Sequence, residues 1–351
     1  MDINKIREDF EAFEDEIIYF DSAATTFKPR KVVEAVRRAL LEGVNDEEVF
    51  QAKKDICSFL NISNIEEFHF VKGATRAINL IAHNLDLKED DEVILSGMEH
   101  HSNLVPWQIA CWQRKAKLKF IPLTSNGEIA FDEYTKLLNE KTKIVSVVHA
   151  SNSLGTINPI KEMIKEAKKV NALFCVDGAQ STPHMKIDIE ELGCDFFTFS
   201  GHKLYAPTGI GRLYIRNNII KAEPYFNQPY ILGLAAAVDY LKENFNDLMK
   251  HEEELLNYAL KEFKKLKIRI VGNSEKRVPL ISFYLEEIHP HDIATILNDN
   301  KICVRAGHHC TQPVMDLFEI SSTTRISLSF YNTFEELDEL FRILKELKET
   351  F

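Results

Sequence analysis

Reactive side chains follow directly after several short apolar runs of this sequence. Asp177 follows the apolar run 173–176, and Lys203 closes the segment Ser200-Gly201-His202-Lys203 that follows the run 196–199. A lysine forms a Schiff base with an aldehyde, and a carboxylate keeps a pyridine nitrogen protonated. Although an aspartate at a strand end is commonly a turn former, the pair together predicts a site for pyridoxal phosphate.

The phosphate of such a cofactor needs hydrogen-bond donors. Gly73-Ala74-Thr75 precedes a helical pattern of apolar residues, so free N–H groups and the helix dipole would face an anion. Ser200 and His202 add donors beside Lys203. A glycine before a helix more commonly serves the turn alone, so this segment predicts a phosphate site only in combination with the others.

Cys310 has the most polar surroundings of the six cysteines. It follows Arg305-Ala306-Gly307-His308-His309, and neighbouring cations favour the reactive thiolate form of a cysteine. Because adjacent residues seldom bind the same ion, we predict no metal site there. The remaining cysteines lie among packing residues and are interpreted as buried small hydrophobes: Cys57, Cys111, Cys175, Cys194 and Cys303.

Arg325 begins another short apolar run, residues 325–329. Most arginines at strand ends simply reach solvent. At a domain cleft, however, the planar guanidinium would hold a substrate carboxylate through two parallel hydrogen bonds.

The elements that must position these residues are short, continuously apolar runs separated by helical patterns. Such runs are typical of parallel strands covered on both faces, and they occupy residues 92–95, 118–123, 144–148, 173–176, 196–199 and 212–215. We therefore expect a doubly wound α/β domain. Ligands bind beyond the carboxyl ends of parallel strands, so the segments beginning at Glu99 and Ser151 should meet Asp177 and Lys203 there. The clearest helix should follow Asn158 as N-cap and Pro159 at its first position.

Strands and helices stop alternating regularly after about residue 220. Two helical stretches (231–244 and 252–266) precede strands at 280–285 and 325–330 and a closing helix from Phe334. This pattern predicts a smaller α+β domain. We expect an N-terminal segment at 1–18 packing with the small domain, a large domain at 19–220 and a small domain at 221–351 that carries Cys310.

Composition excludes several classes of protein. The chain has 351 residues, 45% of them hydrophobic and 28% charged, which is typical of a globular protein. Its net charge of −11 argues against general binding to nucleic acid or anionic membranes. The N-terminus lacks the pattern of a secretory signal, and no apolar run approaches a membrane span. We expect a cytoplasmic protein.

Five segments together resemble the motifs of pyridoxal-phosphate-dependent cysteine desulfurases: Glu99-His100-His101-Ser102-Asn103-Leu104-Val105-Pro106-Trp107, Ser151-Asn152-Ser153-Leu154-Gly155-Thr156, Asp177-Gly178-Ala179-Gln180-Ser181, Ser200-Gly201-His202-Lys203 and Arg305-Ala306-Gly307-His308-His309-Cys310. The first and the last are similar to the SufS-like (group II) branch of the class V aminotransferase family. The resemblance covers nearly the whole chain, from Tyr19 to Thr333. It implies the aminotransferase-like fold (fold type I), normally as a homodimer with the site at the subunit interface.

The resemblance also implies a role for each candidate residue. Lys203 would hold the cofactor as a Schiff base and move the Cα proton, Asp177 would pair with the ring nitrogen, and His100 would stack on the ring. Further cofactor contacts would come from Asn152, Gln180, Ala74, Thr75, Ser200 and His202. Arg325, with Asn152, would bind L-cysteine. Cys310 would take its sulfur as a persulfide, leave alanine, and pass the sulfur to an acceptor or scaffold protein for iron–sulfur cluster assembly or other pathways.

Two segments are shorter than the family pattern. Residues 40–50 pass directly between two helical patterns where relatives carry a segment rich in His, Arg and Gly. Between Tyr214 and Gly233, relatives carry a Gly-rich segment and a Gly-Thr-Pro that reaches the partner's phosphate, and here Gln228 stands in place of the Thr. Arg76 replaces a usually acidic residue. These departures predict a more open pocket and fewer of the usual dimer contacts, but they leave the reactive residues in place.

Two alternatives stay open beside the desulfurase. One is a related pyridoxal phosphate enzyme, such as a C–S lyase, a selenocysteine lyase or an aminotransferase. The other is a low-activity homologue that serves as a binding subunit in a sulfur-transfer complex, which the two shortened segments suggest.

Overall fold

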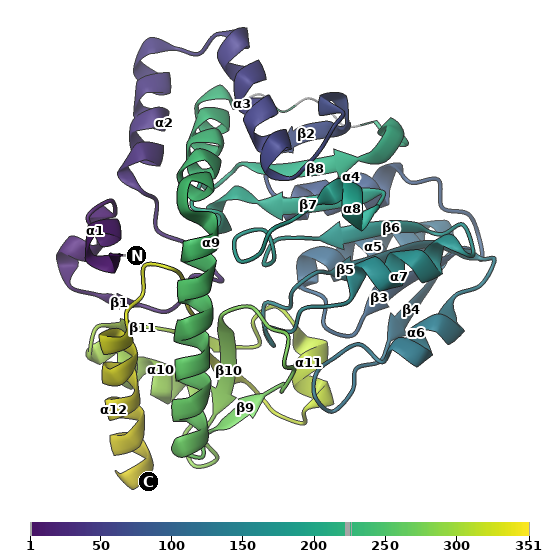
Figure 1. Ribbon diagram of the computed structural model, residues 1–351. Helices are drawn as coiled ribbons and strands as arrows, with labels where there is room; N and C mark the ends of the chain where they lie inside the picture. Colours follow the sequence, from purple (N-terminus) through teal and green to yellow (C-terminus); the bar gives the residue numbers. More distant parts are fainter. Residues whose placement is uncertain (1, 222–224, 226, 351) are drawn as a thin grey trace.

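The computed structural model describes residues 2–221, 225 and 227–350 and is built around a seven-stranded sheet (Figure 1). Its strands are β2 (Phe68–Val71), β3 (Glu92–Ser96), β4 (Lys117–Ile121), β5 (Thr142–Val148), β6 (Leu173–Asp177), β7 (Phe196–Ser200) and β8 (Gly211–Ile215). Their order across the sheet is β2-β8-β7-β6-β5-β3-β4. The consecutive pairs from β7 to β4 are all parallel, which confirms the doubly wound expectation for this part of the sheet.

The expectation of parallel strands is wrong for β8, which runs antiparallel to both β7 and β2. Only residues 201–210 separate β7 from β8, and a parallel crossover needs a dozen residues or more. β2 was not predicted, because four residues at the sheet edge with a histidine among them give little apolar signal.

Apolar side chains cover both faces of the sheet. Val93 and Leu95 pack in the cluster that includes α4 (Ala74–Asn84) and α5 (His101–Arg114). Ile94 points to the opposite cluster, which includes α6 (Phe131–Leu137), α7 (Ile160–Lys168) and α8 (Ile189–Leu192). Continuously apolar strands are therefore required, since successive side chains alternate between two buried faces.

The start of α7 differs from the prediction by one position. The helix begins at Ile160, and Pro159 rather than Asn158 occupies its N-cap. The Asn158 side chain instead donates to the Val148 carbonyl (2.7 Å). The Asn158 side chain is thus hydrogen-bonded to the last residue of β5 and does not cap α7.

The C-terminal part forms a separate sheet, of order β12-β13-β10-β9. Its antiparallel strands are β9 (Arg269–Val271), β10 (Leu280–Tyr284), β12 (Arg305–Gly307) and β13 (Thr323–Ser327). Helices α10 (Pro290–Asp299), α11 (Gln312–Leu317) and α12 (Phe334–Thr350) accompany it. Near the N-terminus, α1 (Ile3–Arg7) is followed by β1 (Ile18–Tyr19), which pairs in parallel with β11 (Ile302–Cys303).

A long helix, α9 (Gln228–Lys265), joins the two sheets (Figure 1). The two predicted helical stretches both lie in α9, and the backbone is non-helical at Asn244, where the first predicted stretch ends. Its first half packs with α2 (Arg30–Glu42) and α3 (Asp46–Phe59), and Leu255 to Phe263 belong to the core of the small sheet. The division near residue 220 stays a prediction. No helix in the described ranges is long and apolar enough to cross a membrane.

Candidate active site

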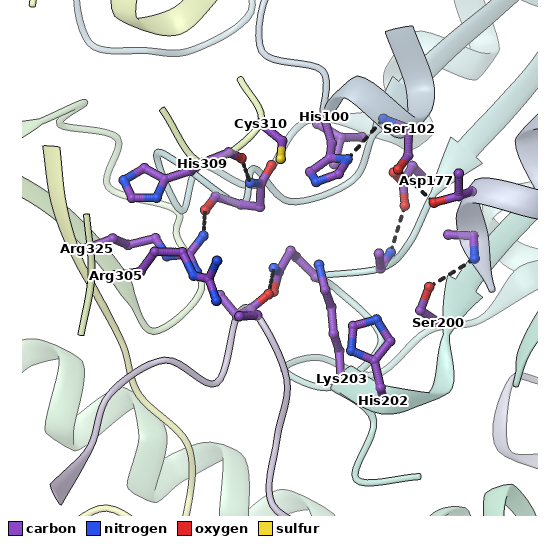
Figure 2. A pocket seen from close by; sticks show the side chains of 18 residues that line it. His100, Ser102, Asp177, Ser200, His202, Lys203, Arg305, His309, Cys310 and Arg325 are labelled. Carbon is purple, nitrogen blue, oxygen red and sulfur yellow. Dashed lines mark hydrogen bonds between the residues drawn. The ribbon is translucent and has the colours of Figure 1, made fainter. Parts of the chain in front are cut away.

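One cavity of about 310 Å³ lies beyond the carboxyl ends of β6 and β7, between the two sheets (Figure 2). Every residue that the sequence singled out as a site residue lines it: Ala74, Thr75, His100, Asn152, Asp177, Gln180, Ser200, His202, Lys203, Cys310 and Arg325. In Figure 2, Arg305 and Arg325 lie at one end and Ser200 at the other, with Cys310 and Lys203 on opposite sides. The cavity therefore has two ends with anion-binding groups and a reactive middle.

Asp177 and Lys203 stand at the ends of adjacent parallel strands. Asp177 is the last residue of β6, and Lys203 belongs to the short 3-10 turn after β7. Asp177 is 3% exposed and accepts a hydrogen bond from the Ala179 backbone (3.0 Å). Burial raises the pKa of Asp177 and lowers the pKa of Lys203 to about 8. The lysine is therefore a better nucleophile near neutral pH than an exposed one.

His100 occupies the N-cap of α5, where its Nδ1 accepts a hydrogen bond from the Ser102 backbone (3.0 Å). Burial, and then the charge of Lys203, lower the pKa of His100 to about 4, so the ring is neutral at pH 7. The preceding Glu99 is buried and accepts hydrogen bonds from Ser96, Asn103 and the Val148 backbone. This network fixes the position at which His100 enters the cavity.

The N-terminus of α4 forms an anion cradle at one end of the cavity. The Ala74 N–H donates to the Ser200 hydroxyl (2.9 Å). Gly73, with φ of 154°, keeps this approach open, since a Cβ there would lie 3.1 Å from the Ser200 hydroxyl oxygen. Thr75 bonds to the Ser102 hydroxyl (2.7 Å), and burial lowers the pKa of His202 to about 4. Helix N-H groups and hydroxyls of this kind bind phosphate.

Two buried amides that line the cavity leave an oxygen atom without a hydrogen-bond partner within the described part of the chain. Asn152 donates its Nδ2 to the His309 carbonyl (2.6 Å), and Gln180 donates its Nε2 to the Ala23 carbonyl (2.8 Å). Within the described residues, no group donates a hydrogen bond to the Asn152 Oδ1 or to the Gln180 Oε1. Buried polar atoms are nearly always hydrogen-bonded, so both oxygens indicate a ligand with hydrogen-bond donors.

These observations test whether pyridoxal phosphate fits. The cavity offers a buried carboxylate for the ring nitrogen, an amine for the aldehyde and a cradle for the phosphate. The orphaned amide oxygens offer acceptors at the remaining polar edge. The residues therefore fit this cofactor.

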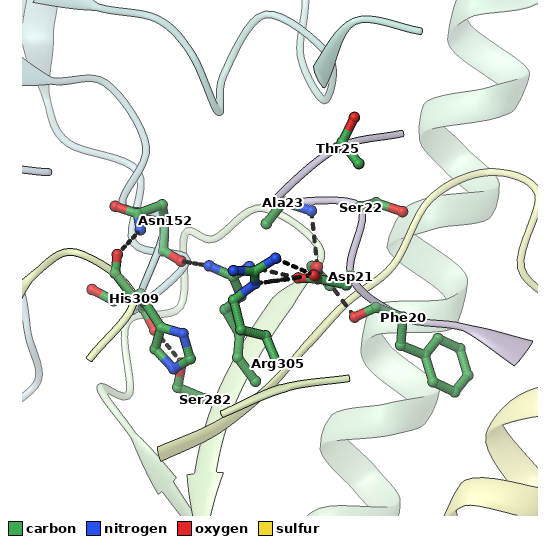
Figure 3. Close-up of polar contacts among 12 residues, drawn as sticks. Phe20, Asp21, Ser22, Ala23, Thr25, Asn152, Ser282, Arg305 and His309 are labelled. Carbon is green, nitrogen blue, oxygen red and sulfur yellow. Dashed lines mark hydrogen bonds and ion pairs between the residues drawn. The ribbon is translucent and has the colours of Figure 1, made fainter. Parts of the chain in front are cut away.

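Arg325, at the opposite end, is held by a residue that sequence reasoning missed. Its Nη2 pairs with Asp21 (2.8 Å) and its Nη1 donates to the Asn152 carbonyl (2.9 Å). Asp21 also pairs with Arg305 (2.8 Å), as Figure 3 shows. Arg325 is 2% exposed, and its buried Nε has no partner in the described structure. Asp21 lay within the family resemblance, but nothing in its local sequence distinguished it from a turn residue.

Cys310 is exposed and lies at the mouth of the cavity. Its backbone is in the left-handed region (φ of 57°), and its carbonyl accepts from the His101 N–H (2.9 Å). The preceding His309, also missed as a site residue, contacts Thr323 Oγ1 (2.7 Å) and Asn152. These contacts anchor the loop while leaving the thiol accessible.

The other cysteines contrast with Cys310. Four are buried as predicted (Cys57, Cys111, Cys175 and Cys194), and Cys303 is half-buried. Burial raises the pKa of Cys57 and Cys111 to about 11, which makes these thiols inert near neutral pH. Within the described ranges, no three His, Cys, Asp or Glu side chains are grouped to hold a metal ion.

Comparison with known proteins agrees with this geometry. The model of the family Aminotransferase class-V matches residues 18–228 and 226–340. The chain is 40% identical over 402 aligned residues to the probable cysteine desulfurase of Halalkalibacterium halodurans, covering 100% of this chain and 99% of the relative. The corresponding protein of Staphylococcus aureus strain N315 is 36% identical over 403 residues, covering 100% and 98%. These alignments exceed 351 residues because the relatives carry segments that this chain lacks.

Solved structures agree as well. Cysteine desulfurase from Thermococcus onnurineus NA1, in its apo form, superposes with a TM-score of 0.93 at 31% identity, covering 99% of this chain and 98% of that chain. CsdA of Escherichia coli superposes with a TM-score of 0.92 at 27% identity, covering 100% and 99%. The chain therefore belongs to the class-V aminotransferase family, among its cysteine desulfurases.

Proposed function

We propose that the protein uses pyridoxal phosphate to convert L-cysteine into L-alanine, with transfer of the substrate sulfur to Cys310. The observation that carries this proposal is an exposed thiol in the lining of a cavity whose opposite side holds Lys203, with the buried Asp177 in the same lining. The substrate C–S bond breaks, the thiol sulfur bonds to the Cys310 sulfur as a persulfide, and a proton takes its place on the alanine product. The bound cofactor supplies the electron sink for the pair released at the substrate Cα.

The side chains divide the remaining work. Arg325 would bind the substrate carboxylate, since its buried Nε and its remaining N–H groups are donors. Lys203, with a pKa of about 8, exchanges a proton with the substrate Cα near neutral pH. His100 is neutral and packs as an uncharged ring, and Asp177 would hold the proton of the ring nitrogen.

Product analysis tests the proposal. Incubation with L-cysteine and a reductant should yield alanine and sulfide in equal amounts. Cys310→Ser should stop sulfur transfer while the cofactor still binds, and Cys303→Ser, at a half-buried cysteine of β11, should retain activity. Pyruvate and ammonia would identify a C–S lyase instead. Failure to bind pyridoxal phosphate would favour a binding subunit.

We also propose that the sulfur goes on to an acceptor protein, in the manner of the SufS-like branch. Because the Cys310 side chain is exposed, a second protein can reach its sulfur without opening the fold. Iron–sulfur cluster assembly is the use expected for that sulfur, and the cytoplasm is the compartment expected for six cysteines without a disulfide framework. Mass spectrometry of Cys310 before and after adding a candidate acceptor would follow the transfer.

A homodimer is the assembly we propose. Thr75 at the phosphate end is exposed, so a second subunit would close the site there. On the outer face of α5, Val105, Ile109 and Trp112 are 43%, 49% and 82% exposed, a stripe at helical spacing. Light scattering should give twice the mass of the chain, and Trp112→Glu should shift the protein toward monomer. A monomeric wild type would contradict the proposal.

A further inference from the structure

A loop of the large domain is joined to a segment of the small domain at one side of the active site. The loop comprises residues 151–157, which lie between β5 and α7, and the segment comprises residues 276–282, which lead into β10 and include its first three residues. The Val278 N–H donates to the Gly155 carbonyl (2.9 Å), and the Ile157 N–H donates to the Lys276 carbonyl (2.9 Å). These bonds flank an antiparallel bridge between Thr156 and Arg277. Two segments more than a hundred residues apart in the sequence are thus paired antiparallel at this point.

We propose that Arg277 is a positioning residue of the active site: its guanidinium holds the 151–157 loop, and with it Asn152, in register with Arg325 and the Cys310 loop. Arg277 is 8% exposed, and its Nη2 donates to the Leu154 carbonyl (2.6 Å) and, more weakly, to the Gly272 carbonyl (3.4 Å). Among the described residues it forms no ion pair. Its side-chain hydrogen bonds are therefore with backbone carbonyls, and the shorter of the two is with the loop, which is what a positioning role requires.

Packing around Leu154 strengthens this anchor. The Leu154 side chain is fully buried, and it lies against Gly127 and Gly272 so closely that a Cβ at either glycine would meet it at 2.9 to 3.0 Å. Gly155 has a φ of 76°, and a Cβ there would lie 2.8 Å from the Leu280 carbonyl. The loop has little room to shift while the side chain and the carbonyl of Leu154 are both held.

The same loop reaches the reactive groups. Asn152 donates to the His309 carbonyl (2.6 Å), next to Cys310, and its own carbonyl accepts from Arg325 (2.9 Å). Ser282, which pairs with Arg325 across β10 and β13, donates to the Ser153 carbonyl. Figure 3 shows Asn152, His309 and Ser282 gathered at this point. The loop 151–157 thus contacts both Arg325 and the segment next to Cys310. Arg277 holds this loop through the Leu154 carbonyl.

Burial lowers the pKa of Arg277 to about 10, because removing the guanidinium from water disfavours its charged form. The residue also lines a wide cleft between the domains, of about 1320 Å³, which contains none of the proposed catalytic residues. Removal of the Arg277 side chain would leave a gap that opens to this cleft. Guanidinium from solution should be able to fill that gap and restore the bond to Leu154.

The experiment compares Arg277→Ala and Arg277→Lys with Arg216→Ala. Arg216 is the matched control: it also donates to a backbone carbonyl (Cys194, 2.8 Å), but it lies at the opposite end of the sheet from the cavity. For Arg277→Ala we expect kcat/KM for L-cysteine to fall about 10- to 100-fold, because small displacements at reacting groups have effects of this size. Amide exchange should accelerate in residues 151–157. Millimolar guanidinium chloride should reverse both changes, Arg277→Lys should be intermediate, and Arg216→Ala should show neither.

Two results would overturn the inference. One is an Arg277→Ala protein whose kcat/KM and loop exchange stay within twofold of the wild type. The other is exchange that accelerates throughout the small sheet and does not respond to guanidinium, which would mean a general loss of stability. If Arg277→Ala does not fold, Arg277→Lys, which keeps the cation, carries the same comparison. The kinetic arm rests on the proposed desulfurase function. The measurement of amide exchange and its reversal by guanidinium do not depend on that function, so they test the role of Arg277 even if the protein is not a desulfurase.

Discussion

Replacing Asp21 by Asn should reveal how strongly the buried arginine depends on its carboxylate. Asp21 pairs with Arg325, whose side chain is 3% exposed, and with Arg305, whose side chain is 49% exposed. Leaving a buried charge without its partner costs about 3–5 kcal/mol, whereas an exposed pair contributes about 0–1 kcal/mol. Because Asn retains an acceptor oxygen, we expect Asp21→Asn to lower the unfolding free energy by about 3 kcal/mol, almost entirely through Arg325.

Urea unfolding of the cofactor-free protein measures this loss, and the KM for L-cysteine should rise as Arg325 loses its fixed position. Two matched variants separate the contributions. Arg305→Gln should cost less than about 1 kcal/mol, and Asp239→Asn, which removes an exposed partner of Lys31, should cost no more. The reasoning would be refuted if Asp21→Asn and Arg305→Gln destabilised the protein equally, because the exposed pair would then contribute as much as the buried one.

Three further outcomes follow from the site and the core. Burial lowers the pKa of His149 to about 4, so between pH 6.5 and 4 the unfolded chain binds a proton that the folded chain does not. The unfolding free energy should therefore fall by about 3 kcal/mol as the pH is lowered over this range, and it should fall less in His149→Gln. Urea titrations at each pH would measure both. Gln180→Ala removes an orphaned acceptor from the cavity and should weaken pyridoxal phosphate binding about tenfold, measured by fluorescence quenching, whereas unchanged affinity would place that oxygen outside the cofactor site. Gly178→Ala would bring a Cβ to 2.1 Å from the Phe197 ring and should cost about 2 kcal/mol by differential scanning calorimetry, with an unchanged transition showing that the ring can move aside.

Local patterns in the sequence were sufficient for the strands of the large sheet. Each predicted apolar run from residue 92 to residue 215 corresponds to a strand, because burial on both faces leaves a continuous apolar signal. The same signal carries no direction, so it could not show that β8 is antiparallel. It was also too weak in β2, and it left out the residues between Asn244 and Glu252, which are helical in α9.

The reactive residues were predictable because their chemistry is local and their motifs are ordered along the chain. Lys203, Asp177 and Cys310 each follow a recognisable pattern, and the rule that ligands bind at the carboxyl ends of parallel strands placed two of them together. The structure brings all of the predicted site residues to one cavity. Their individual roles stay predictions until the variants are measured.

The sequence by itself determined the chemistry that this protein can attempt, since residue type decides which groups are nucleophiles, acids and anion receptors. Tertiary structure alone decided how those groups are supported. Asp21 holds an arginine that is 304 residues away, and Arg277 holds the carbonyl of Leu154. Such pairs leave no local pattern, because the partner of a buried charge is chosen by the packing of distant segments and not by its neighbours in the chain.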